Sequence, residues 1–401
     1  MNAIFIFGLL IITALILGKL VSYIGLPKIT GYLFAGILLD PNISGLITPN
    51  FPDLTNDISN FCLAFITFEV GSTLYLPKLK AQGKALGLMT ILEALLAFAF
   101  VFGGIFLASQ YLLPSELIVF ALPFSLLIAT LASPTDPSAT LAIAHQYKAK
   151  GPVSSTIMGI AAFDDAVGLL LFSIGLGLAK SSTGADGSVM SGVVDSLLEI
   201  GGALVIGVTI GVIFNFIYKF LKSTSKGGVN AILLGLIAFS YGVSSWLEFD
   251  SLITTMTLGF MVTNFNKKSN EISETLETYT EEIIFILFFV LSGLHLNLAG
   301  FTDAIPFIIV FVIFRSLGKY TGVMTGAMLT NQPKSIKKYV VGGLIPQGGI
   351  VVGLALFIQQ IEAFNAFGGL MLNIIMGTTI LHEIFGPIIA KASLRKAGEI
   401  K

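Results

Sequence analysis

The chain has 401 residues, of which 55% are hydrophobic and only 11% charged, and its formal net charge is −1. Soluble domains carry about 25% charged residues, so this composition excludes a soluble globular protein. The basic residues are scattered rather than clustered, which excludes nucleic acid as a partner, and the single cysteine, Cys62, cannot form an internal disulfide.

Apolar runs long enough to cross a bilayer recur along the chain. A crossing takes roughly 20 apolar residues in a helix, because an open backbone of another kind leaves its hydrogen bonds unmade in lipid. We therefore predict an all-α polytopic membrane protein with about 13 transmembrane helices, of which the second and ninth are short. The expected ranges are 3–24, 28–40, 57–76, 85–108, 115–146, 151–179, 192–221, 228–247, 250–265, 280–300, 304–330, 336–360 and 366–391.

The basic residues also predict how the chain is oriented. Lys and Arg near helix ends resist translocation and mark the cytoplasmic side. Of the 22 Lys and Arg residues, 19 flank alternate loops, which places the N-terminus outside and the C-terminus in the cytoplasm. Lys180 lies on the opposite side, whereas Arg315 and Lys319 fall near mid-membrane in the eleventh segment and need another explanation.

A short sequence similarity within the chain indicates an internal repeat. FEVGSTLYL at 68–76, in the third segment, resembles FVLSGLHLNL at 289–298, in the tenth. Segments that are seven apart cross in opposite directions, as expected for two inverted six-helix repeats joined by a linker helix. Transporters often place their site where such repeats meet.

Three glutamates lie inside predicted spans. Intramembrane acids are rare and usually face a cavity or a partner. Glu69 lies near the middle of the third segment and is a candidate for lining a site or pairing with a cation, whereas packing is the alternative. Glu93 and Glu383 lie nearer the cytoplasmic ends of their segments and are expected to be packing or interface acids. No role is assigned to the three histidines.

The fifth segment contains a helix-breaking motif, SPTDPSATLAI at 133–143. Pro134 and Pro137 cannot continue a hydrogen-bonded helix, so we predict an unwound stretch between two half-helices, with a simple kink as the alternative. Asp136 would offset the positive end of a half-helix, and the Thr135 hydroxyl and the freed carbonyls would face a cavity.

The twelfth segment, seven positions later, contains the counterpart, LIPQGGIVVGL at 344–354. Pro346, Gln347, Gly348 and Gly349 can break this helix, and Gln347 is also a plausible polar lining residue. Two discontinuous helices are therefore expected to cross.

The sixth segment carries the strongest local signal, AAFDDAVGLLLF at 161–172. Asp164 and Asp165 fall at its middle, where a structural ion pair is the alternative to a functional site. Neighbouring helical residues point about 100° apart, so one carboxylate can face a water-filled cavity while the other faces a helix. At such a pair, a proton and a cation compete for one site.

The eleventh segment places two cations on one helix face, because Arg315 and Lys319 are four residues apart. Cations at this depth need partners, although snorkelling of the side chains to the interface is the alternative. We expect Lys319 to pair with Asp164, and Arg315 to pair with backbone carbonyls or Glu69.

Together these motifs resemble the monovalent cation/proton antiporter superfamily, in its sodium/proton exchanger type with an Asp-Asp pair, related to the potassium-efflux antiporters. The resemblance spans nearly the whole chain. The residues that carry it are LPKITGYLFAGILLDP at 26–41, TDP at 135–137, the Asp pair at 164–165 and RSLGK at 315–319.

The resemblance implies a homodimer in the cell membrane that works by an elevator-like alternation, without a cofactor. The dimer-domain halves would be 1–80 and 228–300, the core-domain halves 84–180 and 303–396, and the linker helix 191–222. The resemblance also implies that Asp165 binds the alkali cation with the help of Asp164, and that Asp136 stabilises the crossed half-helices.

Several functions stay open beside Na+/H+ exchange. Glu69 in its FEVG context and Arg315 resemble a branch that carries Asn-Asp, so the stoichiometry is undecided and K+/H+ exchange is the first alternative. A sodium-coupled solute symporter or a channel on a related fold is the second. An intramembrane aspartyl protease is disfavoured. By family resemblance, the aspartates of such enzymes stand in YD and GxGD motifs, which are absent here, so we do not expect an enzyme.

Overall fold

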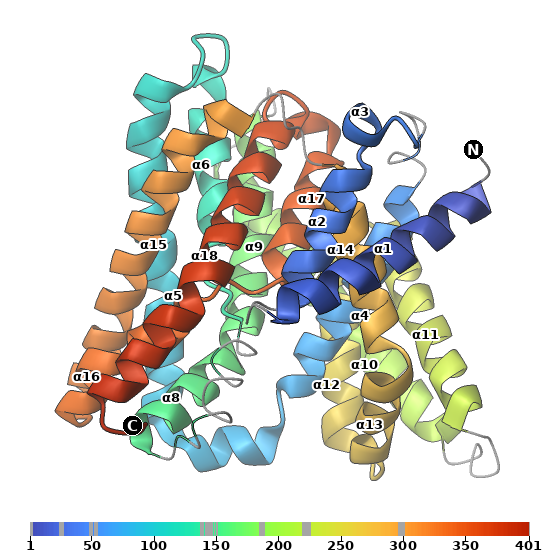
Figure 1. Ribbon diagram of the computed structural model, residues 1–401. Helices are drawn as coiled ribbons and strands as arrows, with labels where there is room; N and C mark the ends of the chain where they lie inside the picture. Colours follow the sequence, from blue (N-terminus) through green and yellow to red (C-terminus); the bar gives the residue numbers. More distant parts are fainter. Residues whose placement is uncertain are drawn as a thin grey trace. The chain divides into compact units, whose positions relative to one another are not determined.

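The computed structural model describes residues 3–23, 28–47, 51, 55–136, 140, 147, 149, 151–183, 189–218, 226–295 and 301–400. Regular structure in these ranges is helical (Figure 1), apart from one isolated bridge between Thr135 and Gln347. The chain forms two compact units. Unit 1 comprises Met1–Lys78 and Val194–His295, and unit 2 comprises Leu79–Val193 and Leu296–Lys401.

Unit 1 is built from helices that approach closely through small residues. A Cβ on Gly71 of α4 would lie 1.8 Å from the carbonyl oxygen of Met256 in α12, and one on Gly259 of α12 would lie 2.0 Å from that of Phe68. Only glycine permits such backbone contact, as is common between helices in membranes. The helices are α1 (Ala3–Tyr23), α2 (Lys28–Leu39), α3 (Pro41–Ser44), α4 (Asn56–Thr73), most of α10 (Val189–Tyr218), α11 (Lys226–Trp246), α12 (Ser251–Phe265), α13 (Ser269–Tyr279) and α14 (Glu281–Leu294).

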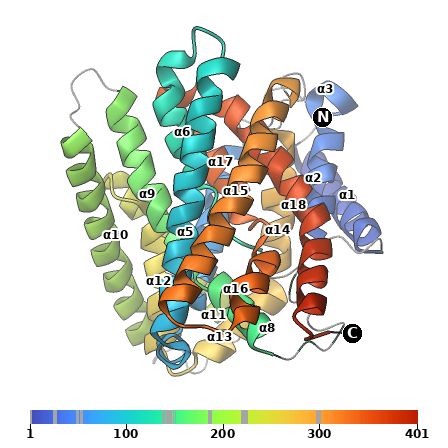
Figure 2. The same cartoon turned by 90° about the vertical axis from the view of Figure 1, so that its left-hand side faces the viewer.

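Unit 2 contains the two motifs with Pro and Gly and the acid pair. Its helices are most of α5 (Leu76–Leu112), η2 (Ile118–Phe120), α6 (Ala121–Thr130), α8 (Pro152–Ala161), α9 (Asp164–Thr183), α15 (Phe301–Leu329), α16 (Lys334–Tyr339), η4 (Val340–Leu344), α17 (Ile350–Gln359), η5 (Glu362–Phe364) and α18 (Gly368–Lys396). Helices α5 and α15 run side by side (Figure 2), and Gly318 and Gly322 of α15 lie against the α5 backbone at Ala97 and Glu93. This close approach brings the side chains of α15 to those of α5.

The all-α prediction is confirmed, since each predicted range contains at least one helix. Among the described residues, seven helices are long and apolar enough to cross a membrane by length and composition. Helix α13 was not predicted, because its polar sequence buries only Ile272, Thr275 and Leu276 and so has no apolar run. The roles of the segments as dimer-domain, core-domain and linker parts stay a prediction.

The sixth segment differs from its prediction. We expected one continuous helix over 151–179, but α8 ends at Ala161 and α9 begins at Asp164, with a turn at Ala162 and Phe163 between them. Nothing in the sequence AAFDD breaks a helix as Pro or Gly does, so this interruption was invisible to pattern reasoning.

Candidate ion-binding site

Two interrupted helices cross in unit 2. Between α6 and Thr140, and between η4 and α17, the described backbone leaves the helical path. The two breaks pair as antiparallel strands do, because Asp136 N donates to Pro346 O at 3.2 Å and Gly348 N donates to Pro134 O at 3.2 Å. The predicted breaks and their crossing are confirmed, except that Pro137 lies outside the described residues.

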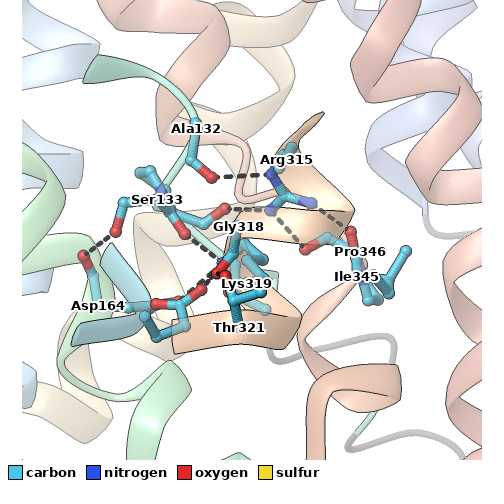
Figure 3. Close-up of polar contacts among 12 residues, drawn as sticks. Ala132, Ser133, Asp164, Arg315, Gly318, Lys319, Thr321, Ile345 and Pro346 are labelled. Carbon is cyan, nitrogen blue, oxygen red and sulfur yellow. Dashed lines mark hydrogen bonds and ion pairs between the residues drawn. The ribbon is translucent and has the colours of Figure 1, made fainter. Parts of the chain in front are cut away.

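Arg315, a residue of α15, hydrogen-bonds to both helix breaks. Its buried guanidinium donates to the carbonyl oxygens of Ala132 at 2.9 Å, Ile345 at 2.7 Å and Pro134 at 2.9 Å, with Pro346 O at 3.5 Å. Figure 3 shows these contacts converging on one side chain. A helix break leaves carbonyl groups without their helical hydrogen bonds, and such groups cost free energy when they are buried without a donor. Arg315 supplies donors to both breaks at once.

The expected alternatives for Arg315 were backbone carbonyls or Glu69, and the structure shows the carbonyls. Glu69 belongs to α4 in unit 1, where its side chain lines a cavity of about 190 Å³. The other residues that line this cavity are Phe68, Ser72, Thr73, Ser273, Leu276, Glu277 and Glu281.

Lys319 lies one turn further along α15 and is fully buried. Its ammonium donates to Glu93 Oε1, to Ser133 O at 2.6 Å and to Thr135 Oγ1 at 2.9 Å. An ammonium group has three N–H donors, so these acceptors use them all. Asp164 Oδ2 lies 3.9 Å from Lys319 Nζ, which is an ion-pair distance but too long for a hydrogen bond.

Glu93 is therefore the closer counter-ion of Lys319, and the expectation that it is a packing or interface acid is wrong. Its side chain, from α5, is fully buried beside the Lys319 ammonium. The sequence contained a usable signal. Glu93 was expected nearer the cytoplasmic end of its segment, and Lys319 follows Arg315 in a segment that ends on the cytoplasmic side, so Glu93 was an available acid for Lys319.

Asp164 and Asp165 occupy the first turn of α9 rather than the middle of a helix. The first N–H groups of a helix have no partners within the helix and favour negative charge nearby. Asp164 is fully buried, whereas Asp165 is partly exposed. The two residues thus differ in exposure, and the idea that one carboxylate faces a water-filled cavity stays a prediction.

The acid pair has oxygens without donors. Asp164 Oδ1 and Oδ2 and Asp165 Oδ1 are buried and accept no hydrogen bond from any residue in the described part of the chain. A buried carboxylate oxygen without a partner is costly, and either a proton or a cation removes that cost. Gly348 lies close to Asp165, because a Cβ there would be 3.3 Å from Asp165 Oδ1.

The donor set suits a hard, weakly held cation. Carboxylates, hydroxyls and backbone carbonyls are oxygen ligands of the kind that hard cations prefer. Across the described ranges, no group of three or more His, Cys, Asp or Glu side chains is placed to hold a metal ion. A cation here would be bound by the two carboxylates together with neutral oxygens such as Thr135 Oγ1.

Helix α18 adds two residues that the sequence reasoning missed. His382 Nδ1 lies 2.8 Å from Gln347 Oε1, and both side chains are buried. Glu383 is also buried, and its side chain lies close enough to the buried Asp136 for the two carboxyl groups to interact electrostatically. Glu383 was expected to be a packing or interface acid, and its burial excludes the interface.

Comparisons with known proteins identify a family for the chain. Residues 9–396 match the family model described as "Sodium/hydrogen exchanger, transmembrane". The Na+/H+ antiporter NhaP of Pseudomonas aeruginosa is 25% identical over 300 residues, covering 70% of this chain and 69% of that protein. The Na+/H+-K+ antiporter GerN of Bacillus cereus is 22% identical over 350 residues, covering 87% and 86%.

The fold is also that of a solved structure. The sodium proton antiporter MjNhaP1 from Methanocaldococcus jannaschii matches with a TM-score of 0.78 and 18% sequence identity, over 98% of each chain. At this identity the likeness concerns the fold alone, and it confirms the antiporter fold expected from the sequence.

Proposed function

Because the chain belongs to the sodium/hydrogen exchanger family, we propose that it exchanges Na+ for H+ across a membrane and that both ions compete for Asp164 and Asp165. The observation that carries this proposal is the pair of adjacent carboxylates with three buried oxygens that lack donors. The family consists of transporters, which sets the aspartyl protease aside.

Asp165 is proposed as the main cation ligand, because it is the partly exposed residue of the pair and its Oδ1 lies beside Gly348. Asp164, fully buried behind it, would assist and would hold a proton when the cation leaves. Binding of a cation and protonation each remove the cost of the same uncompensated negative charge, so one excludes the other.

Lys319 is proposed to stay protonated throughout the cycle. Its three donors are occupied by Glu93, Ser133 and Thr135, and loss of its proton would leave Glu93 as a buried charge without a partner. The exchanged protons would therefore reside on Asp164 and Asp165 rather than on the lysine.

The larger architecture follows from the family resemblance. We propose a homodimer in the cell membrane, with the N-terminus outside, the C-terminus in the cytoplasm and an elevator-like alternation of the part that carries the acid pair. The grouping of the crossed breaks, the acid pair and both buried cations in unit 2 supports this view, since one compact unit holds all the proposed site residues except Glu69.

The site is tested by Asp165→Asn in proteoliposomes that contain a pH-sensitive dye. We expect cation-driven proton movement to be lost, because the neutral amide cannot compensate a cation, while the protein still folds. Asp303→Asn is the matched control, since Asp303 is an exposed acid of unit 2 outside the crossing. Full exchange by the Asp165 variant would reject the site.

K+/H+ exchange is the second candidate, and one observation favours it. The relative GerN is named for both Na+ and K+ and matches 86% of its own length. Challenging the same vesicles in turn with Na+, Li+ and K+, with and without an imposed voltage, separates the candidates and also reports electrogenicity. A pH change that requires an added organic solute would instead indicate a symporter.

A further inference from the structure

The end of the chain caps the helix that leads to the acid pair. Glu399 Oε1 accepts a hydrogen bond from Val153 N at 2.6 Å, and Glu399 Oε2 accepts one from Ser154 N at 2.8 Å. These amides belong to the first turn of α8, where N–H groups lack partners within the helix. A carboxylate at this position also favours the positive end of the helix dipole.

Helix α8 has no cap of its own. Its N-cap residue is Gly151, which has no side chain to accept a hydrogen bond, and Pro152 follows at the first helical position. Ser, Thr, Asp or Asn usually fills that role from within the local sequence. Here the capping group comes from a residue more than 240 positions later in the chain.

A second contact fastens the same two regions, because the Lys391 ammonium of α18 donates to the Tyr147 hydroxyl and lies 4.4 Å from the centre of its ring. The end of α18 and the start of α8 also share a neighbour in η4. A Cβ on Gly342 would lie 2.0 Å from Ser393 Oγ of α18, and one on Gly343 would lie 2.4 Å from Ile157 Cδ1 of α8.

Helix α8 transmits its position to the carboxylates over a short distance. Only Ala162 and Phe163 separate it from Asp164, and this turn is itself hydrogen-bonded, with Phe163 N donating to Ile160 O at 2.9 Å and Val167 N donating to Phe163 O at 3.2 Å. A shift of α8 therefore moves the first turn of α9.

We propose that Glu399 is a positioning residue for transport, which caps α8 and thereby holds Asp164 and Asp165 in the geometry that binds the cation. This inference rests on the proposed function. Glu399 itself touches neither carboxylate, so its effect appears in cation affinity rather than in the chemistry of exchange.

Two variants from opposite sides of the contact test the proposal. Glu399→Ala removes the cap. Gly151→Ala displaces it, because a Cβ on Gly151 would lie 2.3 Å from Glu399 Cδ and Oε1. The Gly151 backbone is extended, with φ 173° and ψ −178°, so alanine causes no backbone strain there. Glu399→Gln, which keeps an acceptor oxygen but loses the charge, is a milder third variant for use if the others fold poorly.

The first readout is the hydrogen exchange of the α8 amides at Val153 and Ser154, which we expect to become faster in both alanine variants. The second is transport, in which each variant is expected to weaken the apparent Na+ affinity roughly fivefold, the size of effect that a lost helix cap has on stability, with little change in maximal rate. The double variant should be no worse than either alone. Glu116→Gln, at an exposed glutamate of unit 2 away from α8, is the control.

Each outcome decides the matter. Faster exchange with unchanged Na+ affinity would mean that the cap is structural only and would overturn the proposal, as would unchanged amide exchange. A wild-type protein that moves no alkali cation would instead overturn the proposed function, and this inference with it. The activity of the wild-type protein thus separates the two failures.

Discussion

The helices inside each compact unit are held together by different contacts in the two units. In unit 1, α4 and α12 meet through glycine backbones, and the hydroxyl groups of Thr67 and Thr255 lie 2.6 Å apart between them. In unit 2, α5 and α15 also meet at glycines, but the same helices bury the Lys319 and Glu93 side chains. Contacts between small residues give close packing. Buried charged side chains at interrupted helices can in addition form a site whose stability depends on bound ions.

This difference has an energetic consequence. Loss of one contact between small residues removes packing that its neighbours partly replace, whereas loss of one partner of a buried charge leaves the other uncompensated. Substitutions in unit 2 should therefore cost more stability than substitutions in unit 1, and they should also change ion binding. Two substitutions in unit 2 and one in unit 1 test that contrast.

Arg315→Ala should cause the largest loss. It strands the carbonyl groups of Ala132, Pro134 and Ile345, and we expect the free energy of unfolding to fall by about 5 kcal/mol, near the upper end of the cost of breaking a buried charged network. Thermal unfolding in detergent measures it. Arg315→Lys should retain only part of the wild-type stability, because an ammonium group cannot reach three carbonyl groups in the geometry of the guanidinium. Equal stability of the alanine variant and the wild type would contradict the role.

Glu93→Gln should rank second, with a loss of about 3 kcal/mol, since it leaves the buried Lys319 ammonium without its closest counter-ion. Adding Lys319→Gln to this variant removes the stranded charge and should restore much of the stability. A double-mutant cycle on the unfolding free energies measures the coupling. Additive losses would show that the two residues do not form a pair.

Gly259→Ala should have the smallest effect of the three, about 1–3 kcal/mol, because its Cβ would overpack against the backbone of α4. Its apparent Na+ affinity should stay at the wild-type value, since the site lies in unit 2. Gly235→Ala is the control, because nothing lies within 4 Å of a Cβ at that position of α11. If Gly259→Ala lowered Na+ affinity as much as Glu93→Gln does, the contrast between the units would fail.

The helical spans and the crossing were predictable because their signals are local. Apolar runs specify the spans, and Pro134, Pro346 and Gly348 cannot sit in an undisturbed helix without cost. The depth of Arg315 and Lys319 likewise followed from their positions within an apolar segment. These inferences needed no knowledge of which helices touch.

The partners were less predictable because they depend on packing. Glu93 and Lys319 are 226 positions apart in the chain and meet only because Gly318 and Gly322 bring α15 against α5. Glu383 reaches Asp136 in the same way, through the position of α18. A pattern of residues shows that a buried cation needs an acid, but the choice among several acids is made by the fold.

The central claim is that protons and a cation exclude one another at Asp164 and Asp165. Its most direct test is addition of Na+ to the purified, weakly buffered protein, with Na+ affinity and proton release measured over a series of pH values. We predict that Na+ releases protons and that its apparent affinity falls as the pH is lowered, because protons then occupy the carboxylates; both effects should vanish in Asp165→Asn. Na+ binding that is independent of pH and releases no proton would contradict the account.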